Sequence, residues 1–258
     1  MTSALLIGTE NGVRTITLNR PDRHNAFDDG LIAELTAAFS AVEDVRAVVL
    51  QSTGKSFSAG GDLAWMKRMA GNSPADNLTD AKALSGLMEA IDSCPRPVIG
   101  VVQGAAYGGG VGLVACCDLV VAAESATFCL SEVKLGLIPA AISPYVVRAM
   151  GGRAARRYSV TAEVFTAATA LTSGLVHEVT AADRLAEVRD AWLTRLKANA
   201  PGAMGAAKRL IRRVTDDPLD RGLRDWTAAQ IADIRAGDEG REGVSAFLEK
   251  RKPSWIGE

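Results

Sequence analysis

The sequence predicts an α/β fold with a largely parallel sheet. Three observations predict it. Short apolar runs alternate with longer segments of helical periodicity through the first half of the chain, small residues gather where strands meet helices, and the last third is helical. Parallel neighbours need a long crossover connection, so a repeat of strand, helix and strand indicates parallel pairing.

The N-terminal part begins as a β-hairpin followed by a helix. Residues 5–8 and 13–18 flank the dipeptide Asn11-Gly12, which is typical of a tight hairpin turn. Apolar residues then recur at helical spacing over 31–42, and Asp28 or Asp29 is a suitable N-cap for that helix.

The remaining elements follow from the same patterns. Buried strands are predicted over 46–51, 97–102 and 118–123. Helical segments are predicted over 62–94 with a break near 71–74, after the glycines at 108–110, and over 185–197, 203–214, 223–235 and 239–251. No linker or low-complexity tract separates them.

The composition suits one large domain, or a domain with a small appendage, whose core needs no disulfide or metal to be stable. The chain has 258 residues, of which 48% are hydrophobic, and its net charge of −1 disfavours nucleic-acid binding. No secretory signal and no membrane-spanning run is evident. The cysteines form no C-x-x-C pair, so we expect reduced, buried thiols in a cytoplasmic protein; they are Cys94, Cys116, Cys117 and Cys129.

Two glycine-rich turns are the candidate chemical features. Gly108-Gly109-Gly110 lies where a strand becomes a helix, and the first N–H groups of that helix have no internal partners and carry partial positive charge. They could stabilise a developing oxyanion. On their own, three glycines are explained more simply by close packing of the strand on the helix. The loop 57–63 also joins a strand to a helix, and Ala59 N–H could be a second donor, with Asp62 as a helix cap.

Taken together, these motifs resemble the crotonase (enoyl-CoA hydratase/isomerase) superfamily. The resemblance covers nearly the whole chain. It rests on residues 18–21, 25–27, 57–62, 108–110, 117–118, 130–132, 135–139 and 247–251. It implies a spiral of ββα units with a C-terminal helical region, acting on acyl-coenzyme A thioesters, with no metal or redox cofactor. We expect residues 1–195 to form the core with the oxyanion hole and coenzyme A site. Residues 196–258 would form a helical trimerisation region of a homotrimer or homohexamer.

The resemblance also implies site residues. Ala59 and Gly109 fall on the two oxyanion-hole donors. The segment that binds coenzyme A corresponds to Ala59, Gly60, Gly61 and Asp62, with Gly108 beside the turn. Lys250 could meet the 3′-phosphate of coenzyme A, sometimes across a subunit boundary, because an ammonium group is a suitable phosphate contact. A solvated C-terminal tail is the simpler reading of Lys250.

Glu132 is the candidate acid–base residue. It lies in the apolar segment 128–133, where burial should raise the pKa of a carboxyl group towards neutrality. A capping role, or an ion pair with Lys134 or a nearby arginine, is the alternative. By resemblance, Glu132 occupies the position of the superfamily's proton-transferring glutamate.

Gly112 departs from the superfamily pattern. Hydratases of the superfamily typically carry a second glutamate two residues after the third glycine, and this chain has Gly112 there. One carboxylate suffices for a Δ3,Δ2-enoyl-CoA isomerase, whereas hydration needs another group to position water. Ser131, Glu89, Tyr107 or a carboxylate of the substrate could help, and Asp62 and Asp118 are alternative acids at structural positions.

A finer resemblance favours hydration. Residues 60–66, 103–109, 116–118, 129–133, 138–145 and 155–158 resemble the bacterial 3-methylglutaconyl-CoA hydratases of leucine or isoprenoid catabolism, which tolerate glycine at position 112. Their substrate carries a distal carboxylate, so we expect a cationic contact in the acyl pocket. The candidates are Lys67, Arg68, Arg148 and Arg153.

Three functions therefore stay open: an enoyl-CoA hydratase, an isomerase that uses Glu132 alone, and a non-catalytic member that binds acyl-CoA or RNA. The first two are separable by ultraviolet absorbance, since hydration removes the conjugation of an enoyl thioester and isomerisation creates it. The two histidines, His24 and His177, have no metal-ligand spacing and no partner nucleophile, so neither is expected to be catalytic.

Overall fold

The chain forms two sheets, and a unit of two strands and a helix, with one strand in each sheet, is repeated along it. The computed structural model describes residues 3–42 and 44–256. The larger sheet has the strand order β1-β2-β3-β5-β7-β10, and after the β1–β2 hairpin every neighbouring pair is parallel. Its strands are Leu5–Glu10, Val13–Leu18, Ala47–Ser52, Val98–Val102, Leu119–Ala123 and Glu178–Thr180.

The smaller sheet is built from short strands that follow the long ones. Its order is β4-β6-β8-β9, parallel except for the last pair. The strands are Ser56–Ser58, Ala105–Tyr107, Thr127–Cys129 and Phe165–Thr166. Three times, a long strand of the first sheet leads to a short strand of the second and then to a helix. The predicted α/β spiral of ββα units is therefore confirmed.

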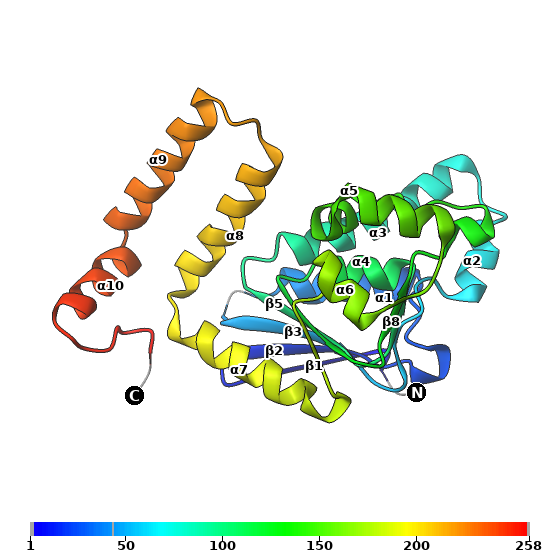
Figure 1. Ribbon diagram of the computed structural model, residues 1–258, viewed down its shortest axis with the longest axis horizontal. Helices are drawn as coiled ribbons and strands as arrows, with labels where there is room; N and C mark the ends of the chain where they lie inside the picture. The colour runs from blue at the N-terminus through cyan, green and yellow to red at the C-terminus, as the bar shows by residue number, and fades with distance from the viewer. Residues whose placement is uncertain (1–2, 43, 257–258) are drawn as a thin grey trace.

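Helices cover both faces of the larger sheet (Figure 1). The helices α1, α3, α4, α5 and α6 lie on one side, and α7 lies on the other, where Leu185, Val188 and Trp192 pack against the strands. The ten helices within the described residues are Asp29–Ser40, Leu63–Met69, Pro74–Asp92, Gly109–Ala115, Ser143–Thr161, Ala167–Ser173, Leu185–Ala198, Pro201–Asp216, Arg221–Ala236 and Asp238–Leu248.

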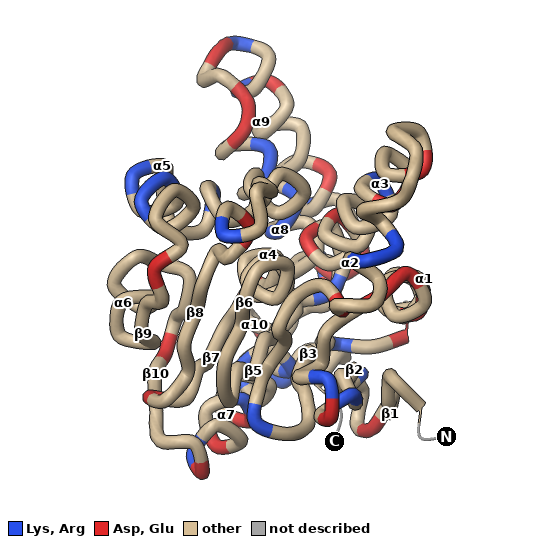
Figure 2. The backbone as a smooth tube through the Cα atoms, turned by 90° about the vertical axis from the view of Figure 1, so that its right-hand side faces the viewer, with Lys and Arg blue, Asp and Glu red and all other residues tan. Residues whose placement is uncertain are grey.

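The last three helices form a C-terminal arm, α8–α10, that extends away from the core (Figure 1). Figure 2 shows α9 projecting beyond the other helices, with acidic and basic positions interspersed. The arm is joined to the core by Lys208, whose Nζ lies 2.6 Å from Asp118 Oδ2 and donates to Arg96 O. The arm begins after α7, so the predicted boundary at 195/196 falls inside that helix.

Most predicted elements are present, and two helices were not predicted. Asp28 is the N-cap of α1, and the predicted break near 71–74 separates α2 from α3. The helices α5 and α6 had no counterpart among the predictions. In α5, Gly151, with φ of +75°, interrupts the helical pattern. The four cysteines are free and buried. No helix among the described residues is long and apolar enough to cross a membrane.

Candidate active site

Asn25 organises the loop that contains the first candidate donor. Its side chain is fully buried, and its Nδ2 donates to Thr53 O (2.7 Å) and Ser56 O (2.8 Å). Its Oδ1 accepts a hydrogen bond from Arg20 N–H at 2.8 Å. One amide side chain therefore ties the polar loop between β3 and α2 to the segment that follows the N-terminal hairpin. Each of these carbonyls would otherwise need another donor.

The amides of Ala59, Gly60 and Gly61 differ in whether they have an acceptor among the described residues. Ala59 N–H donates to His24 O at 2.9 Å, which conflicts with the prediction that Ala59 N–H is available to a ligand. The next amide, Gly60 N–H, donates to Ser58 Oγ at 3.2 Å. Gly61 N–H has no acceptor within the described part of the chain. Residue identity alone could not reveal this, because the acceptor that engages Ala59 lies 35 positions earlier in the chain.

Asp62 holds the end of the loop in place. Its Oδ1 accepts from Ala64 N–H (2.9 Å) and Trp65 N–H (3.2 Å), which confirms the predicted N-cap of α2. Its Oδ2 lies 3.2 Å from Arg23 Nη1 and 3.5 Å from Arg20 Nη2. Burial raises the pKa of Asp62, but the two backbone donors and the arginines outweigh it, so that the pKa is lowered. The side chain therefore supports the loop and stays ionised.

The second candidate donor lies at the start of α4. Gly108 adopts φ of +51° and ψ of −124°, a conformation that favours glycine, and α4 begins at Gly109. As the first residue of a helix, Gly109 has an N–H with no intrahelical acceptor. A Cβ atom on Gly109 would overlap Phe27 Cζ and lie 3.1 Å from Phe27 Cε2. The helix therefore begins directly against the buried ring of Phe27.

The two loops are in backbone contact. Gly60 has φ of +83°, and a Cβ atom there would lie 2.8 Å from Tyr107 O and 3.2 Å from Gly109 N. The loop that carries Gly61 and the turn that carries Gly109 therefore adjoin, which the spacing of their motifs in the sequence could not establish. Two backbone donors at neighbouring helix starts favour binding of a negatively charged oxygen.

Glu132 lies beside the same turn. A Cβ atom on Gly108 would be 3.3 Å from Glu132 Oε1 and 3.6 Å from Ser131 Oγ. Glu132 begins a 3-10 turn over Glu132–Leu135, and its Oε2 is buried without a hydrogen-bond partner among the described residues. Burial raises the pKa of the Glu132 carboxyl, and a hydrogen bond with its own backbone opposes the shift. A carboxyl group in this state can exchange protons near neutral pH.

Among the described residues, no second carboxylate lies at the position opposite Glu132 where the superfamily pattern would place one. Gly112 is buried, and a Cβ atom there would overlap Ile142 Cγ2. The alternative acid Asp118 lies elsewhere, bound to Lys208 and to Val98 N–H (2.7 Å). Asp118 therefore holds the arm and strand β5 together, in agreement with the structural position expected for it.

The other candidate helpers are engaged or exposed. Tyr107 Oη shares a hydrogen bond with Thr127 Oγ1 at 3.3 Å, and Glu89 is exposed on α3. His24 is exposed, with Nδ1 3.0 Å from Ser56 Oγ, and His177 accepts a hydrogen bond from Val120 N–H through Nδ1. Of the three side chains proposed to position water, Ser131 is the one whose hydroxyl the structure places close to Gly108, since a Cβ atom there would be 3.6 Å from Ser131 Oγ.

Two of the four cationic candidates for a distal carboxylate are already paired. Arg68 Nη2 lies 2.8 Å from Asp29 Oδ1, and Arg148 bridges Asp92 and Asp216. The other two candidates are exposed and form no ion pair within the described residues; they are Lys67 and Arg153.

Lys250 is distant from the loops of its own chain. It follows α10, and Figure 1 places α10 at the opposite end of the molecule from α2 and away from α4, which lies in the core. The contact predicted between Lys250 and a bound phosphate would therefore require the arm of another copy. Lys250 itself is exposed and forms no ion pair in the described part of the chain.

Comparison with known families and proteins matches this architecture. A family model described as enoyl-CoA hydratase/isomerase matches residues 8–258. The chain is 32% identical to the 2,3-dehydroadipyl-CoA hydratase of Escherichia coli over 99% of both proteins. It is 38% identical to an enoyl-CoA hydratase of Alternaria alternata, over 92% of this chain and 78% of that protein.

Solved structures match over almost the full length. An enoyl-CoA hydratase from Shewanella pealeana superposes with a TM-score of 0.94 at 45% identity, covering 98% of this chain and 96% of that one. Pseudomonas aeruginosa AtuE superposes with a TM-score of 0.94 at 38% identity, covering 99% of this chain and 100% of that one. The fold described above is thus shared along the whole chain.

Proposed function

The chain belongs to the enoyl-CoA hydratase/isomerase family, and from that premise we propose that it hydrates a branched enoyl-CoA thioester with a second carboxylate, such as 3-methylglutaconyl-CoA. The observation that carries the proposal is the contact between two loops with free backbone donors, beside a buried carboxyl oxygen without a partner. The chain is an enzyme of the crotonase superfamily, so the non-catalytic alternative has no support from its relatives.

We assign the two oxyanion donors to Gly61 N–H and Gly109 N–H, in place of the pair Ala59 and Gly109. The thioester carbonyl oxygen would accept both hydrogen bonds. Its charge increases when the thioester becomes an enolate, so the two bonds strengthen in the transition state. Removing one such donor typically reduces kcat by about 10²–10³-fold.

Glu132 then moves one proton in two steps. As a base it takes a proton from water while the water oxygen bonds to C3 and the C2–C3 π electrons shift to the carbonyl oxygen. As the enolate collapses, the Glu132 carboxyl returns that proton to C2. Water is thus added across the double bond and the carboxylate is regenerated. A carboxyl group whose pKa is raised by burial suits both roles.

The proposal of a dicarboxylic acyl group rests on chemistry around the site. The Escherichia coli relative is named as a hydratase of 2,3-dehydroadipyl-CoA, the thioester of a dicarboxylic acid. Lys67 and Arg153 are the candidate cations that form no ion pair with a carboxylate of the described residues. Either could receive the distal carboxylate, and a charge-assisted contact of this kind would discriminate against a monocarboxylic chain.

We also propose that the arm builds a homotrimer or homohexamer. The arm exposes large apolar side chains, including Leu219 at 82% between α8 and α9 and Phe247 at 81% in α10. Each of the helices α8, α9 and α10 buries one residue within its own chain. Packing against a second copy would cover this surface and bring that copy's Lys250 towards coenzyme A.

A Δ3,Δ2-enoyl-CoA isomerase is the second candidate, favoured by one observation. Ile142 occupies the space next to Gly112, so Glu132 is the one carboxylate that the described residues place at the turn. One carboxyl group can move a proton between C2 and C4 without holding water.

A panel of enoyl-CoA thioesters tests both candidates with Glu132→Gln. The parent should lower the ultraviolet absorbance of 2-enoyl thioesters, and most of all that of 3-methylglutaconyl-CoA. Glu132→Gln should bind the thioester as the parent does and turn it over at least about 10²-fold more slowly. Glu124→Gln, an exposed glutamate in the turn after β7, is the matched control. Activity only towards 3-enoyl thioesters, with rising absorbance, would establish the isomerase instead.

A further inference from the structure

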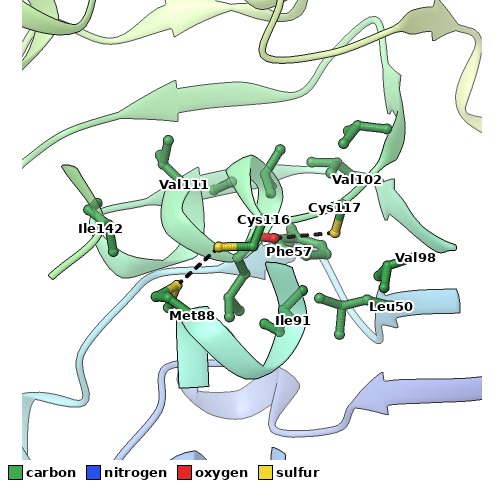
Figure 3. Close-up of a cluster of buried hydrophobic side chains, with 14 of the residues drawn as sticks. Leu50, Phe57, Met88, Ile91, Val98, Val102, Val111, Cys116, Cys117 and Ile142 are labelled. Carbon is green, nitrogen blue, oxygen red and sulfur yellow. Dashed lines mark hydrogen bonds between the residues drawn. The ribbon is translucent and has the colours of Figure 1, made fainter. Parts of the chain in front are cut away.

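Gly112 and Ile142 meet beneath the start of α4. A Cβ atom on Gly112 would overlap Ile142 Cγ2, and it would lie 2.8 Å from Ile142 Cβ and 3.1 Å from Met88 Sδ. Ordinary carbon contacts are about 3.5–4.0 Å. Figure 3 shows Ile142 and Met88 lying against the helix that carries Val111 and Cys116. No side chain fits at position 112 unless Ile142 moves.

Ile142 has little freedom to move. It is 2% exposed, and its carbonyl accepts hydrogen bonds from Tyr145 N–H (3.1 Å) and Val146 N–H (3.0 Å) at the start of α5. Met88, on the other side, is fully buried and receives a hydrogen bond from Cys116 Sγ at 3.7 Å. A packed interior of this kind transmits an added methyl group as strain.

Position 112 is about one helical turn along α4 from the proposed oxyanion donor Gly109. It lies three residues after Gly109 on α4, so the two positions share one face of the helix. Helical side chains point back towards the N-terminus, so a side chain at 112 would extend towards the Gly109 turn, beside which Glu132 lies. Ile142 therefore fills the space from which a second carboxylate could reach the site.

We propose that Ile142 is the specificity-determining residue that limits this site to one carboxylate, and that Gly112 and Ile142 act as a steric pair. A carboxylate at position 112 becomes compatible with the fold only when position 142 loses its side chain. This inference rests on the proposed function for its catalytic meaning, although the packing itself does not depend on it. Ile142 acts through position 112 and touches no reacting atom.

The consequence is a site that is acidic on one side and apolar on the other. Water at C3 has Glu132 as its one carboxylate partner among the described residues, and the remaining hydrogen bonds must come from Ser131 or from the substrate itself. A thioester with its own distal carboxylate meets that need better than a simple acyl chain. The steric pair thus restricts which substrates can be hydrated efficiently.

A double-mutant cycle tests the pairing. Gly112→Ala should lower the melting temperature by at least about 4 °C, because overpacking a core typically costs enough for such a shift. Gly112→Ala/Ile142→Gly should melt higher than the sum of the two single shifts predicts. Gly152→Ala, at a helical glycine in α5 with no atom within 4 Å of the added Cβ, is the control and should not melt lower than the parent. A Gly112→Ala melting temperature equal to that of the parent, or additive shifts, would overturn the steric pair.

A second experiment tests the effect of the steric pair on catalysis, with Gly112→Glu in the presence and absence of Ile142→Gly. The double variant should add a second ionisation to the pH profile of kcat/KM for 2-enoyl thioesters, because two interacting carboxylates titrate as a coupled pair. It should also hydrate a monocarboxylic enoyl thioester at least about 10-fold faster than Ile142→Gly alone. A well-positioned acid–base group typically contributes about 10²-fold or more, so a 10-fold gain is a modest expectation. A coupled melting cycle with an unchanged pH profile would refute the catalytic role of the pair. If the parent hydrates no thioester, the proposed function fails while the melting cycle still decides the pairing.

Discussion

Replacing Gly109 by alanine should reduce catalysis without preventing folding. The added Cβ would overlap Phe27 Cζ and lie 3.1 Å from Cε2, against an ordinary carbon separation of about 3.5–4.0 Å. Phe27 is 1% exposed and cannot swing aside, so the start of α4 must move instead. Relief of the overlap requires a displacement on the order of 1 Å, enough to cost about 10²-fold in rate when it misplaces a reacting group.

The size of the effect follows from what Gly109 contributes. Its N–H is one of two proposed oxyanion donors, and losing one such donor costs about 10²–10³ in kcat, or about 2.7–4 kcal/mol. Overpacking should also destabilise the fold by about 1–3 kcal/mol. The fall should appear in kcat more than in KM, since the hydrogen bond strengthens in the transition state.

Steady-state hydration of the best thioester of the panel, with urea denaturation alongside, measures both effects. Gly86→Ala in α3 is a matched control, because no atom lies within 4 Å of its added Cβ and alanine favours a helix. Gly109→Ala/Phe27→Leu should recover part of the lost rate, since leucine lacks the overlapping Cζ atom. A Gly109→Ala enzyme with kcat within threefold of the parent would show that this amide does not stabilise the oxyanion.

Three further predictions concern stability. Asn25→Leu should lower the free energy of unfolding, measured in urea, by about 2–6 kcal/mol, because two loop carbonyls each lose their donor at about 1–3 kcal/mol. A loss under about 1 kcal/mol would contradict the role given to Asn25. Lys208→Met should lower the free energy of unfolding by about 3–5 kcal/mol, because it leaves Asp118 without its cation. Adding Asp118→Asn should recover part of that loss, and additive losses in the two single variants would show that the pair is not coupled. Burial lowers the pKa of His177 below 6.5, and its Nδ1 accepts a hydrogen bond from Val120 N–H, so the unfolded chain binds the proton more tightly than the folded one. The melting temperature should therefore fall as the pH drops below about 6.5, and His177→Asn should remove that dependence on pH. An identical dependence in both proteins would exclude His177 as its source.

The fold could be predicted where periodicity is local. The hairpin at Asn11-Gly12, the cap at Asp28 and the break between α2 and α3 each depend on a few neighbouring residues. The strands β4, β6 and β8 have three residues each, too few to show an alternating pattern. Helix α5 was missed because a glycine with positive φ divides its apolar pattern.

The site was predictable in its residue types and not in the direction of its amides. Both glycine turns and Glu132 were identified from their motifs, and they lie together. The engagement of Ala59 N–H depends on the carbonyl of His24, a residue with positive φ that ends the short 3-10 helix Pro21–Arg23 in a distant part of the chain. The filling of position 112 depends on Ile142, 30 residues later. Contacts at such separations are set by tertiary packing, which local patterns do not encode.

Because the proposed anion-binding groups belong to the main chain, no side-chain substitution can delete them. Scanning this enzyme with alanine would leave both N–H groups in every variant, so the scan would reveal them only where the added methyl group displaces the turn, as expected for Gly109→Ala. The position of these N–H groups, and with it the activity, can instead be changed through buried residues such as Phe27 and Ile142, which pack against the glycines of α4. Variation in activity among natural or selected forms of this protein should therefore be sought in its hydrophobic interior.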